Sequence, residues 1–363
     1  MKIQDNFVCT TRRIDALFDG LRPDRVPLVG LVVAGGGFSI VNCGFTLPEL
    51  QTNPKKAFQA ELWTHEQYEW DIFSLEPNHT VYGSWDFGAK MKMPEDEYSF
   101  SIIPISFGAN NEEDVQTLQL PDPITAGAIP KRVEYARLLI ELGLPIGFNS
   151  RSPFNMAADI CPIEKFARWL MKKPALCERL MEIALVHTFN VLRYFVETFG
   201  AEKIRVGLSS PSESNQLFSP KLIEKYAIPY HREYHRRLRS LGIRKFIFHI
   251  CGDQNLNLPN LSKFADSSDS WPHPSILSFG HEADLNEASK YFPEDIIQGN
   301  INPTVIQFGT PQEIYEKSRA CIEKGKMIPG GFIFAPGCDL PPRAPSHNVW
   351  MMTKAIRDFG YYD

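Results

Sequence analysis

The feature of this sequence that most constrains its fold is a regular alternation of short apolar runs with longer amphipathic segments. Eight runs have the length and composition of buried strands, and most are separated by segments long enough for a helix. Asn53-Pro54, Ser219-Pro220 and Thr310-Pro311 each place proline after a helix N-cap residue, which marks the start of three helices. Repeated strand–helix alternation predicts an α/β fold, a (β/α)8 TIM-type barrel, with a doubly wound sheet as the alternative. The predicted strands are residues 26–33, 72–75, 145–149, 204–209, 245–251, 275–280, 296–301 and 331–335.

Several regions depart from this rhythm, but all fit a single barrel domain over residues 1–363. Residues 1–24 predict a short helical lead-in that ends at Gly20. Residues 81–128 are rich in proline, glycine, aspartate and asparagine, which predicts a long insertion of loops and hairpins over the barrel mouth. Residues 153–199 predict two consecutive helices, at about 163–172 and 174–199, and a kink is expected later at Pro229.

Composition is that of an ordinary globular enzyme. Of the 363 residues, 43% are hydrophobic and 22% are charged, and the net charge of −5 without a basic stripe argues against nucleic acid as a partner. No run approaches the roughly 18 apolar residues of a membrane-spanning helix, and the N-terminus lacks the apolar core of a signal peptide. We therefore expect a cytoplasmic protein with no membrane partner. The seven cysteines are odd in number and widely spaced, which predicts free thiols.

A possible metal site lies at the end of the strand predicted over residues 245–251. Side chains two apart on a strand share a face, so His249 and Cys251 point the same way. Cys338 follows the last predicted strand, and all three would gather at the carboxyl ends of the barrel strands, where such enzymes have their active sites. Three nitrogen and sulfur ligands with one open position are typical of catalytic zinc. The alternative is that these residues simply pack in the core.

Polar residues also follow other predicted strands, at the same end of the barrel. We expect some of them to contact a substrate, although loop residues of this kind are often only solvent-exposed. Glu282 is a further catalytic candidate, because its carboxylate could approach the fourth metal position; alternatively, it belongs to the acidic first turn of the next helix. The substrate-binding candidates are His79, Asn149, Arg151, Glu213, His281 and Asn300.

Four motifs occur in order along the chain: His249-Ile250-Cys251-Gly252, Gly299-Asn300-Ile301-Asn302-Pro303, Phe308-Gly309-Thr310-Pro311 and Gly337-Cys338-Asp339-Leu340-Pro341-Pro342. In these motifs the sequence resembles the uroporphyrinogen decarboxylase superfamily, and more closely its branch of zinc-dependent, corrinoid-linked methyltransferases. The resemblance implies that His249, Cys251 and Cys338 bind Zn²⁺ and that the fold is the barrel. It also implies a corrinoid (cobalamin) cofactor, which we expect on a partner corrinoid protein because the chain has no Asp-x-His-x-x-Gly motif.

The expected function is methyl transfer from a small methylated substrate to cob(I)alamin of the corrinoid protein. An aryl methyl ether is the preferred donor, because aromatic residues lie in segments that could roof the pocket. The first alternative is a methylcorrinoid protein:thiol methyltransferase of the coenzyme M type. The second is a decarboxylase-type lyase, but the arginine-bearing substrate motif of that branch is absent after the first strand. The aromatic residues are Trp63, Trp70, Tyr82, Trp85, Phe87, Phe148 and Phe154.

Overall fold

A parallel sheet of six strands forms most of the barrel wall in the computed structural model, which describes residues 5–31, 37–75, 82–95, 102–265 and 271–362. The strands pair in chain order, from β3 to β8, each with the next. Their burial on both faces explains why they read as near-continuous apolar runs. They are β3 (Ile146–Arg151), β4 (Ile204–Ser209), β5 (Phe246–Ile250), β6 (Ile276–Phe279), β7 (Ile296–Ile301) and β8 (Phe332–Pro336).

The first two predicted strands are present only as single bridges, so the expectation of eight strands is confirmed for six. Leu28 bridges β8 at Phe334, and Leu75 bridges β3 at Ile146. Between these two segments, the N–H of Asp71 donates to the carbonyl of Leu28 at 2.7 Å, and the N–H of Leu28 donates to the Asp71 carboxylate at 2.9 Å. The Asp71 carboxylate thus binds the Leu28 N–H that would otherwise join a regular strand ladder. The neighbouring Pro27 has no N–H to donate, so a regular strand does not form here.

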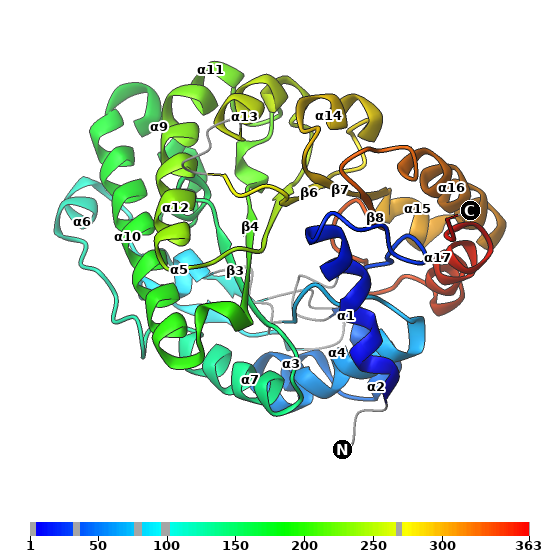
Figure 1. Cartoon of the computed structure of the whole chain (residues 1–363). Coiled ribbons are helices and arrows are strands. Elements are labelled where there is room, and N and C mark those ends of the chain that lie inside the picture. Colours follow the sequence, from blue (N-terminus) through cyan, green and yellow to red (C-terminus); the bar gives the residue numbers. More distant parts are fainter. Residues whose placement is uncertain (1–4, 32–36, 76–81, 96–101, 266–270, 363) are drawn as a thin grey trace.

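Helix α1 (Asp5–Phe18) covers the end of the barrel where the strands begin, as Figure 1 shows. Ile14 and Leu17 of this helix pack in one apolar cluster with residues at the start of β6, β7 and β8. The lead-in helix predicted from the sequence is therefore the plug of the barrel floor. The other members of this cluster are Val29, Phe73, Ile276, Ile296 and Ile333.

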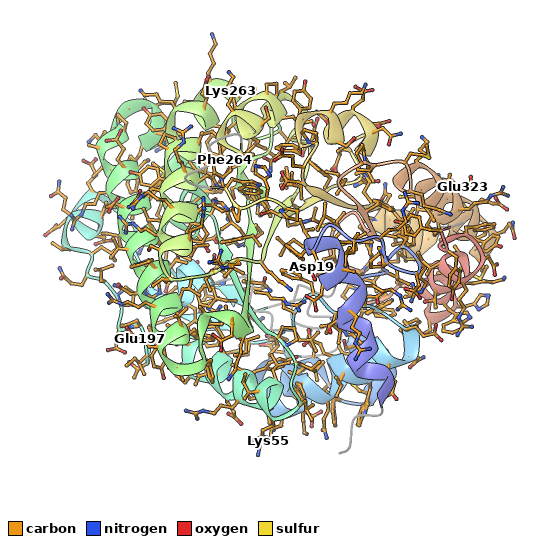
Figure 2. The ribbon with its side chains drawn as sticks, in the orientation of Figure 1. Asp19, Lys55, Glu197, Lys263, Phe264 and Glu323 are labelled. Atoms are coloured by element: carbon orange, nitrogen blue, oxygen red, sulfur yellow. The ribbon has the colours of Figure 1, made fainter. Side chains whose placement is uncertain are left out.

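The remaining large helices surround the strands, and the main core lies between them and the sheet (Figure 1). Charged side chains such as Lys55, Glu197 and Glu323 point outward from these helices, whereas Phe264 is buried beneath them (Figure 2). The helices are α4 (Pro54–Tyr68), α7 (Ile129–Glu141), α8 (Pro153–Ile160), α9 (Ile163–Lys172), α10 (Pro174–Phe199), α12 (Ile228–Ser240), α13 (Leu258–Ala265), α14 (Leu285–Tyr291), α15 (Pro303–Phe308), α16 (Pro311–Gly325) and α17 (Ser346–Phe359).

The three predicted helix starts are confirmed, and two of them have side-chain caps. Asn53 accepts hydrogen bonds from two backbone N–H groups at the start of α4, and Thr310 accepts one from Glu313 at the start of α16. The kink expected at Pro229 takes another form. Helix α11 (Pro220–Leu222) continues into a π-helical turn over Ile223–Ala227, and α12 follows it. The wider π turn is one way to fit proline, which cannot donate to the helix ladder.

The described part of the insertion at 81–128 contains a helix, a small hairpin and a second helix. Strands β1 (Met91–Lys92) and β2 (Ile103–Pro104) are antiparallel, which confirms the expected hairpin, and α5 (Tyr82–Asp86) and α6 (Glu112–Thr117) flank it. The insertion is tied to the outer helices through Ala109 with Ile160 and through Arg179 with Val115. Among the described residues, no helix is long and apolar enough to cross a membrane.

Candidate metal centre

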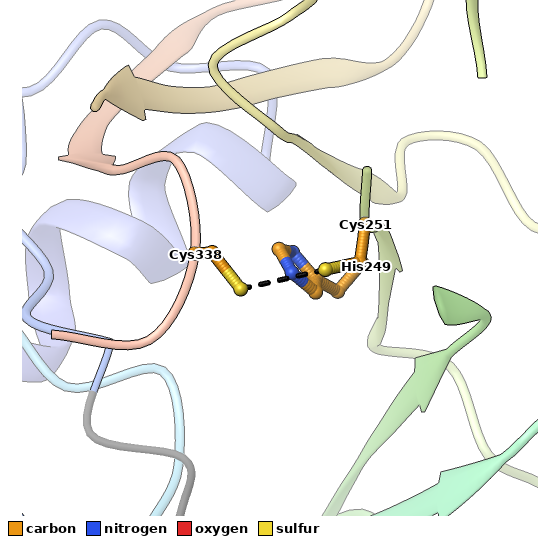
Figure 3. Close-up of side chains that lie close together, drawn as sticks. All are labelled: His249, Cys251 and Cys338. Carbon is orange, nitrogen blue, oxygen red and sulfur yellow. Dashed lines mark hydrogen bonds between the residues drawn. The ribbon is translucent and has the colours of Figure 1, made fainter. Parts of the chain in front are cut away.

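Alternation along β5 explains why His249 faces the barrel interior. Phe246, Phe248 and Ile250 are buried toward the outer helices, while Ile247 and His249 are only partly buried. Cys251 follows the strand on the same face as His249. Cys338 lies two residues after β8 ends, and the loop turns its thiol toward the other two side chains (Figure 3).

These three side chains form a group that could hold a metal ion. Their ligand atoms all lie within 4.8 Å of one another, and each residue is partly exposed. The Cys251 and Cys338 sulfurs are 3.4 Å apart, well beyond the roughly 2.05 Å of a disulfide bond. The prediction of free thiols is confirmed for the six cysteines whose side chains the structure describes, and the predicted ligand set does come together in space.

The two thiols shift each other's pKa in opposite directions. The pKa of Cys338 is lowered, first by its hydrogen bond with Cys251 and further by the neighbouring His249. The pKa of Cys251 is raised, first by the same hydrogen bond and then by burial. The pair therefore loses its first proton, from Cys338, more easily than its second, from Cys251. Two thiolates this close would repel each other, and a cation placed between the sulfurs would relieve that repulsion. Metal binding accordingly deprotonates the thiols that coordinate the ion.

The imidazole of His249 is oriented by two polar side chains inside the barrel. His249 Nδ1 lies 3.0 Å from Ser278 Oγ, and Gln298 Nε2 donates to the same oxygen at 3.1 Å. Strand register places the three residues side by side on β5, β6 and β7. With Nδ1 engaged, Nε2 is the nitrogen left for a metal, and an outer partner of this kind is the usual way to fix a ligating histidine.

The donor set fits zinc. Two thiol sulfurs and one imidazole nitrogen are its preferred ligands, and three protein ligands leave one coordination position for a substrate. Glu282 stands outside the group of three. Its carboxylate lies against Gly280, where a Cβ would collide with it, and its charge contributes to the raised pKa of Cys251 after the larger effects of Cys338 and burial.

Of the substrate-binding candidates, Asn149 and Arg151 lie closest to the predicted position, at the carboxyl end of a strand and toward the barrel interior. Both are on the less buried face of β3, and the Asn149 side chain lies over Gly207 of the adjacent strand β4, where any Cβ would overlap it. Arg151 acts on the thiols, since its charge works to lower the pKa of Cys251 against the larger raising effects of Cys338 and burial. Its Nε lies 3.5 Å from Asp159.

The side chains of the other described candidates lie outside the group of three. Glu213 is fully buried and accepts hydrogen bonds from Ser152 and, at 2.8 Å, from His231. His281 and Asn300 line a separate cavity of about 390 Å³ beside α16. The Asn300 amide donates to the carbonyls of Gly280 and Ala283 and so holds the loop after β6. His79 lies outside the described residues.

Ser278 and Gln298 were not predicted as part of the site. Both interrupt apolar strands with a polar side chain, which is a signal that could have identified them, and both are fully buried. Glu61 and His65 on α4 were not predicted either, and they line a cavity in the barrel interior together with His249. Their spacing is that of an ordinary helix face, so the sequence contains no signal that separates them from core residues.

Four of the seven aromatic residues expected to roof the pocket are core residues instead, whereas Trp63 and Trp85 are only partly buried. Trp70, Phe87, Phe148 and Phe154 are all at least 93% buried, and none lines the interior cavity as described. Phe148 packs edge to face on Phe195 behind the sheet. The reason is strand parity, because Phe148 and Asn149 are neighbours on β3 and cannot both face the interior.

Comparison with known proteins relates this site to a family. Residues 10–359 match the family model described as uroporphyrinogen decarboxylase (URO-D). The methylcobamide:CoM methyltransferase MtaA of Methanosarcina barkeri is 22% identical over 356 residues, which covers 97% of this chain and 98% of that protein. The methylcobamide:CoM methyltransferase MtbA of Methanosarcina acetivorans is 24% identical over 279 residues, 76% of each chain.

A solved structure shares the fold. A methyltransferase from Methanosarcina mazei superposes with a TM-score of 0.80 at 20% sequence identity, covering 96% of this chain and 98% of that one. The superfamily expected from the motifs is thus confirmed, and the similar proteins fall on its corrinoid methyltransferase side. The chain belongs to the uroporphyrinogen decarboxylase (URO-D) family.

Proposed function

We propose that this protein is a zinc-dependent methyltransferase that moves a methyl group from a corrinoid protein to a small thiol. The observation that carries the proposal is the group formed by His249, Cys251 and Cys338, whose ligand atoms lie within 4.8 Å at the carboxyl ends of β5 and β8. Supporting it, MtaA, which is named for methyl transfer from methylcobamide to coenzyme M, aligns over 97% of the chain. The thiol alternative is therefore favoured over an aryl methyl ether.

In this proposal each residue of the centre has a defined part. His249, Cys251 and Cys338 hold the ion, and Ser278 keeps the His249 ring in the orientation that presents Nε2. A zinc ion bound here would bind the incoming thiol as its thiolate at neutral pH, which makes the sulfur nucleophilic. Glu282, whose charge acts on Cys251, would be the candidate for the fourth position before the thiol binds. Asn149 and Arg151, on the interior face of β3, contact the substrate.

The methyl group would be delivered from outside the chain. The corrinoid protein docks over the carboxyl ends of the strands, because the three ligands are partly exposed at that end. An in-line displacement then requires the thiolate, the methyl carbon and the cobalt to lie on one line, with the methyl bond to cobalt breaking as the bond to sulfur forms.

The test uses zinc-loaded protein with methylcobalamin or a methylated corrinoid protein, and a panel of small thiols. We expect loss of the methylcobalt absorbance only when thiol and zinc are both present, and the matching methyl thioether in mass spectra. Transfer from a methoxyarene to cob(I)alamin without transfer to any thiol would instead support the aryl ether function. Decarboxylation of a porphyrinogen by metal-free protein would support the lyase.

A further inference from the structure

Cys251 lies just past the hydrogen-bonded part of β5. The last paired residue of this strand is Ile250, opposite Phe279 of β6, and none of the described strand pairs includes Cys251. Gly252 then turns the chain with a φ of 73°, a conformation that favours glycine. A metal site needs each ligand atom within about 0.2 Å of its place, so a contact outside the strand ladder must fix the Cys251 backbone.

The side chain of Gln254 supplies this contact. Its Nε2 donates to the carbonyl oxygen of Cys251 at 3.1 Å and to that of Ser210 at 3.0 Å, and Ser210 Oγ lies 3.3 Å away. Ser210 follows β4, and its own N–H donates to the carbonyl of His249 at 3.3 Å. The backbones of two of the three ligand residues are thus joined to the end of β4 through Ser210 and Gln254.

Gln254 is itself held in one orientation. Its side chain is buried, and Asn257 Nδ2 lies 3.5 Å from Gln254 Oε1 and 2.9 Å from the carbonyl oxygen of Glu213. Because the Asn257 amide nitrogen has two hydrogens, it can donate to both oxygens. A reversed Gln254 amide would place its oxygen against the carbonyls of Ser210 and Cys251, and buried oxygens without donors are unfavourable.

Glu213 anchors these contacts in the protein interior. Its carboxylate is fully buried, accepts a hydrogen bond from Ser152 and lies 2.8 Å from His231 Nε2. Ser152 follows β3 and His231 is on α12, so Glu213 joins the ends of two strands to an outer helix. Removing either partner from a buried carboxylate is costly, which keeps Glu213 in this position.

We infer that Gln254 is a positioning residue for the metal centre, which sets where the Cys251 thiol lies relative to the His249 ring. Glu213 acts through Asn257 to hold Gln254 in place, a different part from the substrate contact predicted for it. The inference rests on the proposed function, since it takes Cys251 as a zinc ligand. Removing outer groups that orient metal ligands typically weakens metal binding by roughly 10–100-fold.

The test is Gln254→Met, which nearly preserves the side-chain volume and removes the donated hydrogen bonds. We expect zinc affinity in chelator competition to fall by roughly 10-fold, because the Cys251 backbone is no longer held. With cobalt(II) in place of zinc, the thiolate-to-metal charge-transfer absorbance should be weaker than in the wild type. Gln51→Met is the matched control, since Gln51 on α3 (Leu47–Thr52) is equally buried at 3% exposure, and it should keep the wild-type affinity and spectrum.

A second variant, Asn257→Leu, tests the support behind Gln254. It removes the donor to Gln254 Oε1 at similar volume, and zinc affinity should fall less, by roughly threefold. The double variant should bind zinc about as weakly as Gln254→Met alone, because two residues that act through one contact are not additive. Additive losses would overturn the part assigned to Asn257 and Glu213.

The outcomes separate this inference from the proposed function. If the wild-type protein binds neither zinc nor cobalt(II), the proposed function fails and the inference with it. If the wild type binds the metal, and Gln254→Met has the same affinity and spectrum, the inference is overturned and the proposed function stands. An equal loss in Gln51→Met would also overturn it. Circular dichroism of the metal-free variants checks that each is folded; if Gln254→Met is not, unchanged zinc binding in Asn257→Leu overturns the inference.

Discussion

The two ends of the barrel are built from opposite chemistry. At the floor, α1 plugs the strands with Ile14 and Leu17, and buried charge is paired, as in the contact of Asp71 with Arg13 at 3.0 Å. At the mouth, two thiols lie 3.4 Å apart beside an imidazole, and all three side chains are partly exposed.

This difference separates stability from function. At the floor, buried charges such as that of Asp71 are paired within the chain, so these residues contribute to the stability of the folded barrel. The mouth presents groups that repel one another as thiolates and that a metal would satisfy. Substitutions at the floor should therefore change the free energy of unfolding, and substitutions at the mouth should change metal binding.

The largest effect is expected from removing a thiol at the mouth. In Cys338→Ala or Cys251→Ala, zinc affinity should fall by more than about 100-fold, because loss of an outer partner alone costs roughly 10–100-fold. Methyl transfer should be lost with the metal, while circular dichroism shows a folded barrel. Chelator competition measures the affinity. Cys321→Ala is the matched control, as this thiol on α16 contacts the Gly299 carbonyl and lies outside the ligand group. Stoichiometric zinc in both ligand variants would contradict the assignment.

The counterpart at the floor is Asp71→Asn. It leaves Arg25 buried without its partner carboxylate, and we expect the free energy of unfolding to fall by about 3–5 kcal/mol, as for other broken buried pairs. Denaturant unfolding measures the change, and zinc affinity should stay at the wild-type value.

The control for the floor is Asp24→Asn, which removes the other carboxylate bound to Arg13. The Asp24 side chain is 55% exposed, so the loss should be below about 1 kcal/mol. Equal losses in the two variants would show that burial does not set the energetics of the floor.

A smaller effect at the mouth is expected from Ser278→Ala. Because the His249 ring would lose its partner at Nδ1, zinc should bind roughly 10–100-fold more weakly, while the thermal unfolding of metal-free protein changes little. Ser275→Ala, at the buried start of the same strand region, is the control and should retain full affinity. Wild-type affinity in Ser278→Ala would show that the hydrogen bond does not orient the ligand.

The smallest of these effects concerns how the free energy of unfolding changes at acid pH. Burial lowers the pKa of His65 to about 4, below the value of about 6.5 in an unfolded chain. The unfolded state therefore binds more protons, and the stability from neutral His65 is present above about pH 6.5 and is lost as the pH falls toward 4. We expect roughly 1–2 kcal/mol of this loss by pH 5.

The substitution His65→Gln should flatten that pH dependence in denaturant unfolding. His347→Gln, at an exposed position on α17, should leave the slope as in the wild type. An unchanged slope in His65→Gln would assign the acid sensitivity to other groups.

Much of the fold was predictable because its signals are local. Helices α9 and α10 begin and end at the predicted residues, and six of the eight apolar runs form the paired sheet. The ligand set was also predictable, since His249 and Cys251 are two apart on one strand and Cys338 follows another. Strand parity could further have excluded Phe148 from the pocket, because Asn149 beside it takes the interior face.

The sequence by itself determined which residue types stand at the carboxyl ends of the strands, because hydrophobic periodicity and helix caps are patterns of neighbouring residues. Only the tertiary structure decided how residues far apart meet. Asp71 closes the ring against Leu28, Gln298 reaches His249 through Ser278, and Glu61 faces the cavity from α4. These contacts depend on the parallel register of the strands and on the packing of helices around them, neither of which is encoded in any short stretch of residues.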